Sequence, residues 1–176
     1  MGAQKEILAT PLVKNKAEVE KETEKIIHTM LISIFFRKIY SIEEVLLIYV
    51  PFCVIEFSIG NAGKGKKAKA LSHLAVSTDV SSGRMTPLID PEDLAMGPVE
   101  VDSDIISVVK PDEEAIEAAA RKELLFHVLP NNLRAWREYE LEATSKKIFY
   151  RPAWLVHYKL FGKYHVYKTF GDPFNL

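Results

Sequence analysis

A loop rich in glycine and lysine is the first segment whose residue types could do chemistry. Residues 60–66 fit the pattern Gly-x-x-x-x-Gly-Lys and follow a stretch typical of a β-strand. In a nucleotide-binding loop of this kind, backbone amides hold phosphates and the residue after the lysine is a Ser or Thr that binds Mg²⁺. Here that residue is Lys67, and an ammonium group has no lone pair to offer a metal. We therefore interpret the segment as a basic, solvated loop. Its lysines are Lys64, Lys66, Lys67 and Lys69.

A second basic segment, 144–170, contains no acidic residue and has aromatic residues between its cations. Single-stranded nucleic acid is bound by cations that contact phosphates and by aromatic rings that stack on bases. Trp154 and Tyr158 belong to an apolar strand face and are expected in the core, whereas Tyr167 lies on the other face. The candidate nucleic-acid-binding residues are the four loop lysines together with Lys146, Lys147, Arg151, Lys159, Lys163, Tyr167 and Lys168.

The basic segments also have an explanation within the chain. Residues 86–117 contain ten Asp or Glu and one Lys. Such an acidic segment can lie across the basic hairpins and neutralise them, with each exposed ion pair contributing little. Charge asymmetry suggests a charged partner without identifying it, so both interpretations stay open.

Two histidines would form a metal site under only one hairpin register. If the turn at Gly162 has three loop residues, His157 and His165 lie opposite each other on neighbouring strands. Imidazoles placed in this way could bind a transition metal. With a two-residue turn, His165 is paired with Tyr158 instead, and the two ligands are separated. The metal hypothesis therefore depends on the register.

No motif indicates a catalytic centre. The sequence has no Gly-x-Ser-x-Gly, His-Glu-x-x-His or Cys-x-x-Cys pattern. Its single cysteine, Cys53, stands among apolar residues at alternate positions, which favours a buried and inert thiol. We therefore expect a non-catalytic protein without a cofactor.

The composition indicates a folded protein without disulfides. The 176 residues are 48% hydrophobic and 27% charged, and their net charge is -1. These values exclude disordered and collagen-like chains, and one cysteine permits no internal disulfide. The chain begins without an apolar signal segment, and its apolar stretches, 26–36 and 45–59, are shorter than the about 20 residues of a membrane-spanning helix. We therefore expect a soluble, cytoplasmic protein.

Two similar runs of alternating apolar residues, 49–59 and 150–160, indicate an internal duplication. Every second residue in both runs is apolar or aromatic, which is the period of a half-buried strand. Pro51 and Pro152 stand at equivalent positions near the two strand starts. Each run is followed by a glycine-containing turn, so each copy is expected to form an antiparallel hairpin. The return strands are expected at 71–78 and 164–170.

A helix is expected upstream of each hairpin. Asn15 and Glu18 have the spacing of a capping box, and apolar residues at intervals of one, three and four follow them. Pro111 and Asp112 open the second helix. Short helical turns are further expected at 41–44 and 136–139, and a short strand at 105–109.

The end of the first hairpin resembles the PepSY-type repeat. Its return strand closes with Thr78-Asp79-Val80-Ser81-Ser82-Gly83-Arg84, and in that family a strand commonly closes with Asp, two residues, Ser or Thr, and Gly. The second copy departs from this pattern, since Lys168-Thr169-Phe170-Gly171-Asp172 stands there. The resemblance implies a fold of one helix and two strands. The family's association with peptidase regulation is not carried over, because its members are mostly secreted or membrane-attached.

We therefore predict an α+β fold of two pseudo-repeats, each of helix, strand and strand, with antiparallel hairpins that pack on the helices and can join into one sheet. The repeats are 1–85 and 111–176, and 86–110 is an acidic, proline-containing linker. Neither repeat alone would bury a large core, so we expect them to pack together. The predicted function is a non-catalytic interaction module that binds a protein partner or a second copy. Nucleic-acid binding, and small-ligand binding in a groove between the repeats, are the alternatives.

Overall fold

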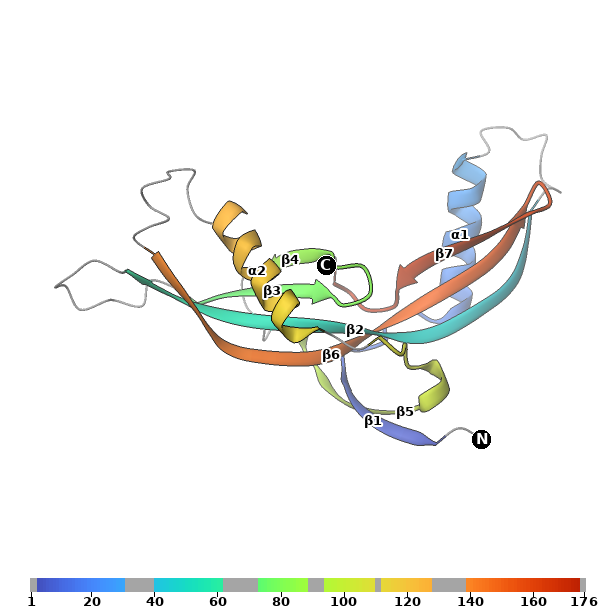
Figure 1. Cartoon of the computed structure of the whole chain (residues 1–176). Coiled ribbons are helices and arrows are strands. Elements are labelled where there is room, and N and C mark those ends of the chain that lie inside the picture. The colour runs from blue at the N-terminus through green and yellow to red at the C-terminus, as the bar shows by residue number, and fades with distance from the viewer. Residues whose placement is uncertain are drawn as a thin grey trace. The chain divides into compact units, whose positions relative to one another are not determined.

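The structure is a computed structural model that describes residues 3–30, 40–61, 73–88, 94–109, 112–127 and 139–174. Within these residues, two α-helices and seven strands confirm the predicted α+β class (Figure 1). The helices are α1 (Lys16–Met30) and α2 (Glu113–His127). The strands are β1 (Gln4–Ala9), β2 (Tyr40–Asn61), β3 (His73–Asp79), β4 (Met85–Leu88), β5 (Gly97–Asp102), β6 (Tyr139–Leu160) and β7 (Lys163–Phe170).

The strands belong to one sheet, in the order β4-β3-β2-β6-β1-β5, with β7 beside β6. The chain divides into two compact units. Unit 1 consists of residues 1–50, 97–107 and 151–175, and unit 2 of 51–96 and 108–150. β2 and β6 therefore each contribute one part to either unit, and each unit combines segments from both halves of the chain.

Unit 1 contains α1, β7 and the parts of β2 and β6 that lie next to them. The helix begins with the expected capping box: the Asn15 N–H donates to Glu18 Oε2 at 2.9 Å, and the Glu18 N–H donates to Asn15 Oδ1 at 3.0 Å. These two bonds satisfy backbone donors that have no partner within the first helical turn. The core of this unit is formed by Val19, Val45, Trp154 and Val156, with Ile42, Leu47 and Tyr167 partly buried against it.

Unit 2 contains the hairpin β2–β3, the short strand β4, α2 and the first part of β6. Cys53, Ile55 and Phe57 occupy alternate positions of β2 and are fully buried, which confirms the expected apolar strand face. Asp112 Oδ1 accepts from the Ala115 N–H at 3.1 Å and starts α2. The remaining core residues are Val76, Ala120, Leu124 and Leu141.

Each helix packs on a hairpin that lies far from it along the chain. α2 packs on β2 and β3, and α1 packs on Trp154, Val156 and Tyr167 of the hairpin β6–β7 (Figure 1). The reason is the length of the two central strands, which are 22 residues each. At about 3.3 Å per residue, the second half of such a strand begins about 35 Å from its start. A helix that precedes the strand therefore covers only the first half.

The sequence expectations were wrong where β2 and β6 begin. β2 starts at Tyr40 and β6 at Tyr139, so the expected helical turn at 41–44 is a strand, and 136–138 lie outside the described residues. The Ser41 hydroxyl donates to Glu43 at 2.5 Å instead of capping a helix. Pairing with neighbouring strands supplies backbone hydrogen bonds that outweigh this local cap signal.

The linker also differs from expectation. Its strand is β5, which pairs antiparallel with β1, a strand that the apolar pattern did not reveal. The strand expected at 105–109 is reduced to one parallel bridge between Tyr49 and Ile106. The Ser107 N–H donates to the Tyr49 carbonyl at 2.9 Å beside that bridge.

Candidate binding surface on the hairpin β6–β7

The hairpin β6–β7 turns through two residues, Phe161 and Gly162. Their φ angles are 50° and 76°, which is the backbone of a type I′ turn. Such a turn fixes the register, and Leu160 is paired with Lys163. The hairpin is therefore a tight one, with strands that continue directly from the turn.

This register overturns the metal hypothesis. His165 is paired with Tyr158, and their rings stack with centroids 5.3 Å apart, whereas His157 is paired with Val166. A two-residue turn thus separates the histidines that a three-residue turn would have placed together. Among the residues that the structure describes, no group of three or more His, Cys, Asp or Glu could hold a metal ion.

One face of the hairpin is covered by α1. Trp154 and Val156 are buried there, and Tyr167 lies opposite Val156 and packs against the same core. The expectation that Tyr167 is an exposed aromatic residue is therefore wrong. The expectation failed because Trp154 is paired with Thr169 and Val156 with Tyr167, which places Tyr167 on the core face.

The opposite face of the hairpin is exposed and carries both cations and apolar side chains. We call this face, formed by Lys159, Tyr164, Val166 and Lys168, the hairpin surface. The side chain of Tyr164 is 73% exposed and that of Val166 is 59% exposed. Apolar residues that an ordered strand holds side by side in water mark a binding surface more often than single exposed ones do.

Lys159 of the hairpin surface forms an ion pair with Glu43. Its Nζ lies 3.4 Å from Glu43 Oε2 and 4.5 Å from the centre of the Tyr164 ring. Hydrogen bonding to Tyr164 raises the pKa of Lys159, and the nearby Glu43 carboxylate raises it further. The Lys159 ammonium therefore stabilises the position of the Tyr164 ring through a cation–π contact, and it adds a positive charge to the hairpin surface.

Arg151 lies in the interior and cannot contact a nucleic acid, which corrects the sequence-based prediction. Its side chain is fully buried and forms a two-point pair with Asp172: Nε lies 2.7 Å from Oδ2, and Nη2 lies 2.6 Å from Oδ1. Arg151 Nη2 also donates to the Phe174 carbonyl at 2.6 Å, and Thr10 Oγ1 donates to Asp172 Oδ2 at 2.7 Å. The pair therefore fastens the C-terminal segment to β6.

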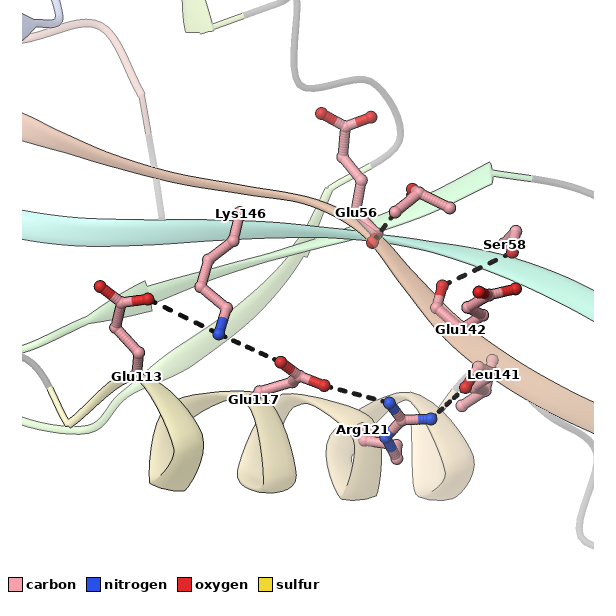
Figure 2. Close-up of polar contacts among 9 residues, drawn as sticks. Glu56, Ser58, Glu113, Glu117, Arg121, Leu141, Glu142 and Lys146 are labelled. Atoms are coloured by element: carbon pink, nitrogen blue, oxygen red, sulfur yellow. Dashed lines mark hydrogen bonds and ion pairs between the residues drawn. The ribbon is translucent and has the colours of Figure 1, made fainter.

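Lys146 is also engaged within the chain. Figure 2 shows its Nζ between two carboxylates of α2, at 3.7 Å from Glu113 and 3.1 Å from Glu117. Arg121 approaches the other oxygen of Glu117 at 3.1 Å and donates to the Leu141 carbonyl. Hydrogen bonds from Lys146 and Arg121 lower the pKa of Glu117, and the bond to Glu117 raises the pKa of Lys146. Internal neutralisation by the acidic segment is therefore realised at this lysine.

Figure 2 also shows how the two long strands are joined beside this network. Thr144 Oγ1 donates to the Glu56 carbonyl at 3.3 Å, and Ser58 Oγ donates to the Glu142 carbonyl at 3.5 Å. These side-chain bonds run in both directions between β2 and β6 within unit 2. They hold the strand that presents Lys146 to α2.

The remaining candidates divide into three groups. Lys147, Lys163 and Lys168 are exposed. Cys53 is buried, and burial raises its pKa to about 11, so the thiol stays protonated and is a poor nucleophile. The four lysines of the loop lie outside the described residues. They are Lys64, Lys66, Lys67 and Lys69.

Comparisons with known proteins do not extend this description. No protein-family model matches the chain, and no significant match was found among curated proteins or solved structures. The resemblance to the PepSY-type repeat therefore stays a prediction from the sequence. In the part of the chain that the structure describes, neither helix is long and apolar enough to cross a membrane.

Proposed function

We propose that this protein is a non-catalytic interaction module that binds a partner protein through the hairpin surface. The observation that carries the proposal is the pair of exposed side chains, Tyr164 and Val166, which the ordered strand β7 holds on one face. Interfaces are enriched in tyrosine at their centre and polar at their rim. Lys159 and Lys168 stand on the same face as these two side chains and would form that polar rim.

The test compares two substitutions of exposed valines. Val166→Glu places a charge in the centre of the hairpin surface, and Val108→Glu does the same at a valine that is 91% exposed elsewhere. Both variants should fold, because neither side chain belongs to the core. We expect affinity for the partner captured from source-cell extract to fall at least about tenfold with Val166→Glu only. Equal binding of that partner by the two variants would contradict the proposal.

A second function, single-stranded nucleic-acid binding, is favoured by one observation: an exposed tyrosine ring with a lysine ammonium 4.5 Å from its centre. A ring and a cation of this kind can serve a base and a phosphate together. The test is fluorescence anisotropy with labelled oligonucleotides at about 50 and 200 mM salt. Binding that weakens with salt and with Lys64→Ala, Lys66→Ala and Lys67→Ala would favour this function over the first.

We also propose that the chain arose by internal duplication and that the protein is cytoplasmic. The duplication is supported by the two hairpins: the Pro51 carbonyl accepts from Val80 at 3.1 Å, and the Pro152 carbonyl accepts from Gly171 at 2.8 Å. The proposed cytoplasmic location rests on the single cysteine, because a chain with one cysteine forms no internal disulfide and disulfides are rare in the cytosol. Fractionation of source cells with an antibody against the protein tests it.

A further inference from the structure

We propose that the outer edge of β7 binds an extended acidic segment of a partner protein, which adds to the sheet as a further antiparallel strand. This inference rests on the proposed interaction function and specifies its partner and its binding mode.

The turn determines which backbone groups of β7 point away from β6. In a two-residue hairpin, the residues that flank the turn exchange hydrogen bonds, and every second pair beyond them does the same. Leu160 and Lys163 flank the turn, and the bond from the Gly171 N–H to the Pro152 carbonyl continues this alternation at the far end. The N–H and C=O groups of Tyr164, Val166 and Lys168 consequently point toward the outer edge.

The equivalent edge of the other hairpin already carries a strand. There, the Asp79 N–H donates to the Arg84 carbonyl at 2.9 Å, and β4 pairs with β3 from Thr78 to Ala75. A shift of 101 residues from β2 to β6 and of 91 residues from β3 to β7 converts the β2–β3 register into the β6–β7 register. The second shift places Ala75 and Ser77 at Val166 and Lys168. Among the described residues, β7 pairs only with β6, so the position that β4 occupies on β3 is open on β7.

The two edges also differ in how they are protected. Pro87 stands opposite Val76 in β4, at a position that faces away from β3 because the bonded pairs alternate from Asp79 and Arg84. A proline at such a position lacks the N–H that an additional strand would need. β7 has the sequence Lys-Tyr-His-Val-Tyr-Lys-Thr-Phe and contains no proline. Its backbone can therefore accept a further strand.

The charges on β7 determine which strand fits. Lys163 and Lys168 are exposed on the strand, and the segment 144–170 has no acidic residue. A second copy of β7 would bring lysines of both chains onto one small sheet edge, which lysines on edge strands normally oppose. An acidic segment would place carboxylates beside these lysines and apolar residues beside Val166. Charge complementarity thus favours an acidic partner over self-pairing.

The experiment has two stages and uses the full chain. A displayed library of random ten-residue peptides is selected on the protein, and the enriched sequences are synthesised. We expect two acidic residues five positions apart, opposite Lys168 and Lys163, and an apolar residue two positions after the first, opposite Val166. Amide hydrogen exchange is then measured by NMR with and without the best peptide. The outward amides of Tyr164 and Val166 should exchange rapidly in the free protein and become protected on binding. The inward amides of His165 and Tyr167 should be protected in both states.

A pair of variants at one position tests the backbone contact directly. Val166→Pro removes an outward N–H, as Pro87 does in β4, and leaves the bonds between β6 and β7 in place. Val166→Thr keeps that N–H and is the matched control. Peptide affinity should fall roughly tenfold in the proline variant and little in the threonine variant. An unchanged affinity in the proline variant, with the hairpin register retained by NMR, would exclude strand addition.

The other outcomes also decide between models. A peptide that binds the hairpin surface without protecting the outward amides would overturn strand addition and leave the interaction function standing. Protection that rises with protein concentration alone would identify a second copy as the occupant. Protection produced by an oligonucleotide would identify nucleic acid instead. Enrichment of basic or uncharged peptides, or of none, would overturn the acidic segment as the partner.

Discussion

At the scale of single residues, the Arg151–Asp172 pair shows how a charge that looks suited to a surface can belong to the interior. Both side chains are fully buried, and the guanidinium lies 4.0 Å from the centre of the Phe170 ring. Removing two charges from water is costly, and a close two-point geometry with further hydrogen bonds offsets that cost. The contribution of Arg151 is thus structural.

We expect Arg151→Met to lower the free energy of unfolding by about 3–5 kcal/mol, because it leaves the Asp172 carboxylate buried without its cation. Urea unfolding monitored by circular dichroism measures this loss. The double variant Arg151→Met, Asp172→Leu should recover part of it, since no unpaired charge remains. Lys147→Met, at an exposed lysine four residues earlier in β6, is the control. A loss no larger than that of this control would show that the pair contributes little.

The pH dependence of the Lys146–Glu117 contact follows from the directions of the two pKa shifts. The pKa of Glu117 is lowered from 4.5, so its stabilising contribution is present above that value and is lost as pH falls through the folded-state pKa. The pKa of Lys146 is raised from 10.5, so its contribution is present below that value and is lost as pH rises through the folded-state pKa.

We therefore expect Lys146→Ala to raise the pKa of Glu117 toward 4.5, its ordinary value. Carboxyl ¹³C shifts followed through an acid titration would measure this change. Lys147→Ala is the matched control, because Lys147 follows Lys146 in β6 and therefore faces away from α2 by the alternation of a β-strand. An unchanged Glu117 titration in the Lys146 variant would show that Arg121 alone lowers the pKa.

At the scale of elements, the tight turn at Phe161 and Gly162 decides which side chains share a face. A positive φ is unfavourable for a phenylalanine, whereas asparagine adopts it readily, and Asn-Gly is the preferred type I′ sequence. The Phe161 side chain is also 56% exposed, so its replacement removes little packing. The positive φ of Phe161 is thus an unfavourable backbone conformation, and the strand pairing on both sides of the turn holds the residue in it.

We expect Phe161→Asn to stabilise the hairpin by about 0.5–1 kcal/mol without changing the register. Thermal unfolding gives the stability, and cross-strand NMR contacts between Tyr158 and His165 give the register. Gly162→Ala is the opposite change, because φ at this position is 76°, and it should destabilise the hairpin. A stabilising Gly162→Ala would contradict the type I′ assignment.

At the scale of the whole molecule, the two central strands link two separate hydrophobic cores. Leu124 belongs to the core of unit 2, where it packs with Cys53, Ile55 and Phe57. The same strand, β2, continues into unit 1 and supplies Val45 to the other core. Because β2 supplies residues to both cores, loss of packing in one unit should lower the stability of the whole strand.

We expect Leu124→Ala to lower the free energy of unfolding by about 3 kcal/mol, through lost apolar burial and the cavity that it leaves. Amide exchange should accelerate in residues 40–50 of β2 as well as in 51–61, since the strand unfolds as a whole. Val108→Ala, at an exposed valine, is the control for a surface substitution. Acceleration confined to 51–61 would show that the two units unfold independently.

The sequence by itself determined the features that depend on near neighbours. Asn15 and Glu18 are three residues apart and form the expected capping box, and the alternation of Cys53, Ile55 and Phe57 marked a strand face that is buried. These signals are local, because the period of a strand and the cap of a helix are set by the backbone geometry of a few residues. The α+β class followed from them.

Only the tertiary structure decided which face of each strand is covered and which charges remain at the surface. Arg151 and Asp172 are 21 residues apart, and Lys146 and Glu117 are 29 apart, so no local pattern could pair them. Tyr167 and Tyr164 look alike in the sequence, and the register and α1 together bury one and expose the other. A period of two identifies two faces but not which one a helix covers, because that depends on contacts between distant segments.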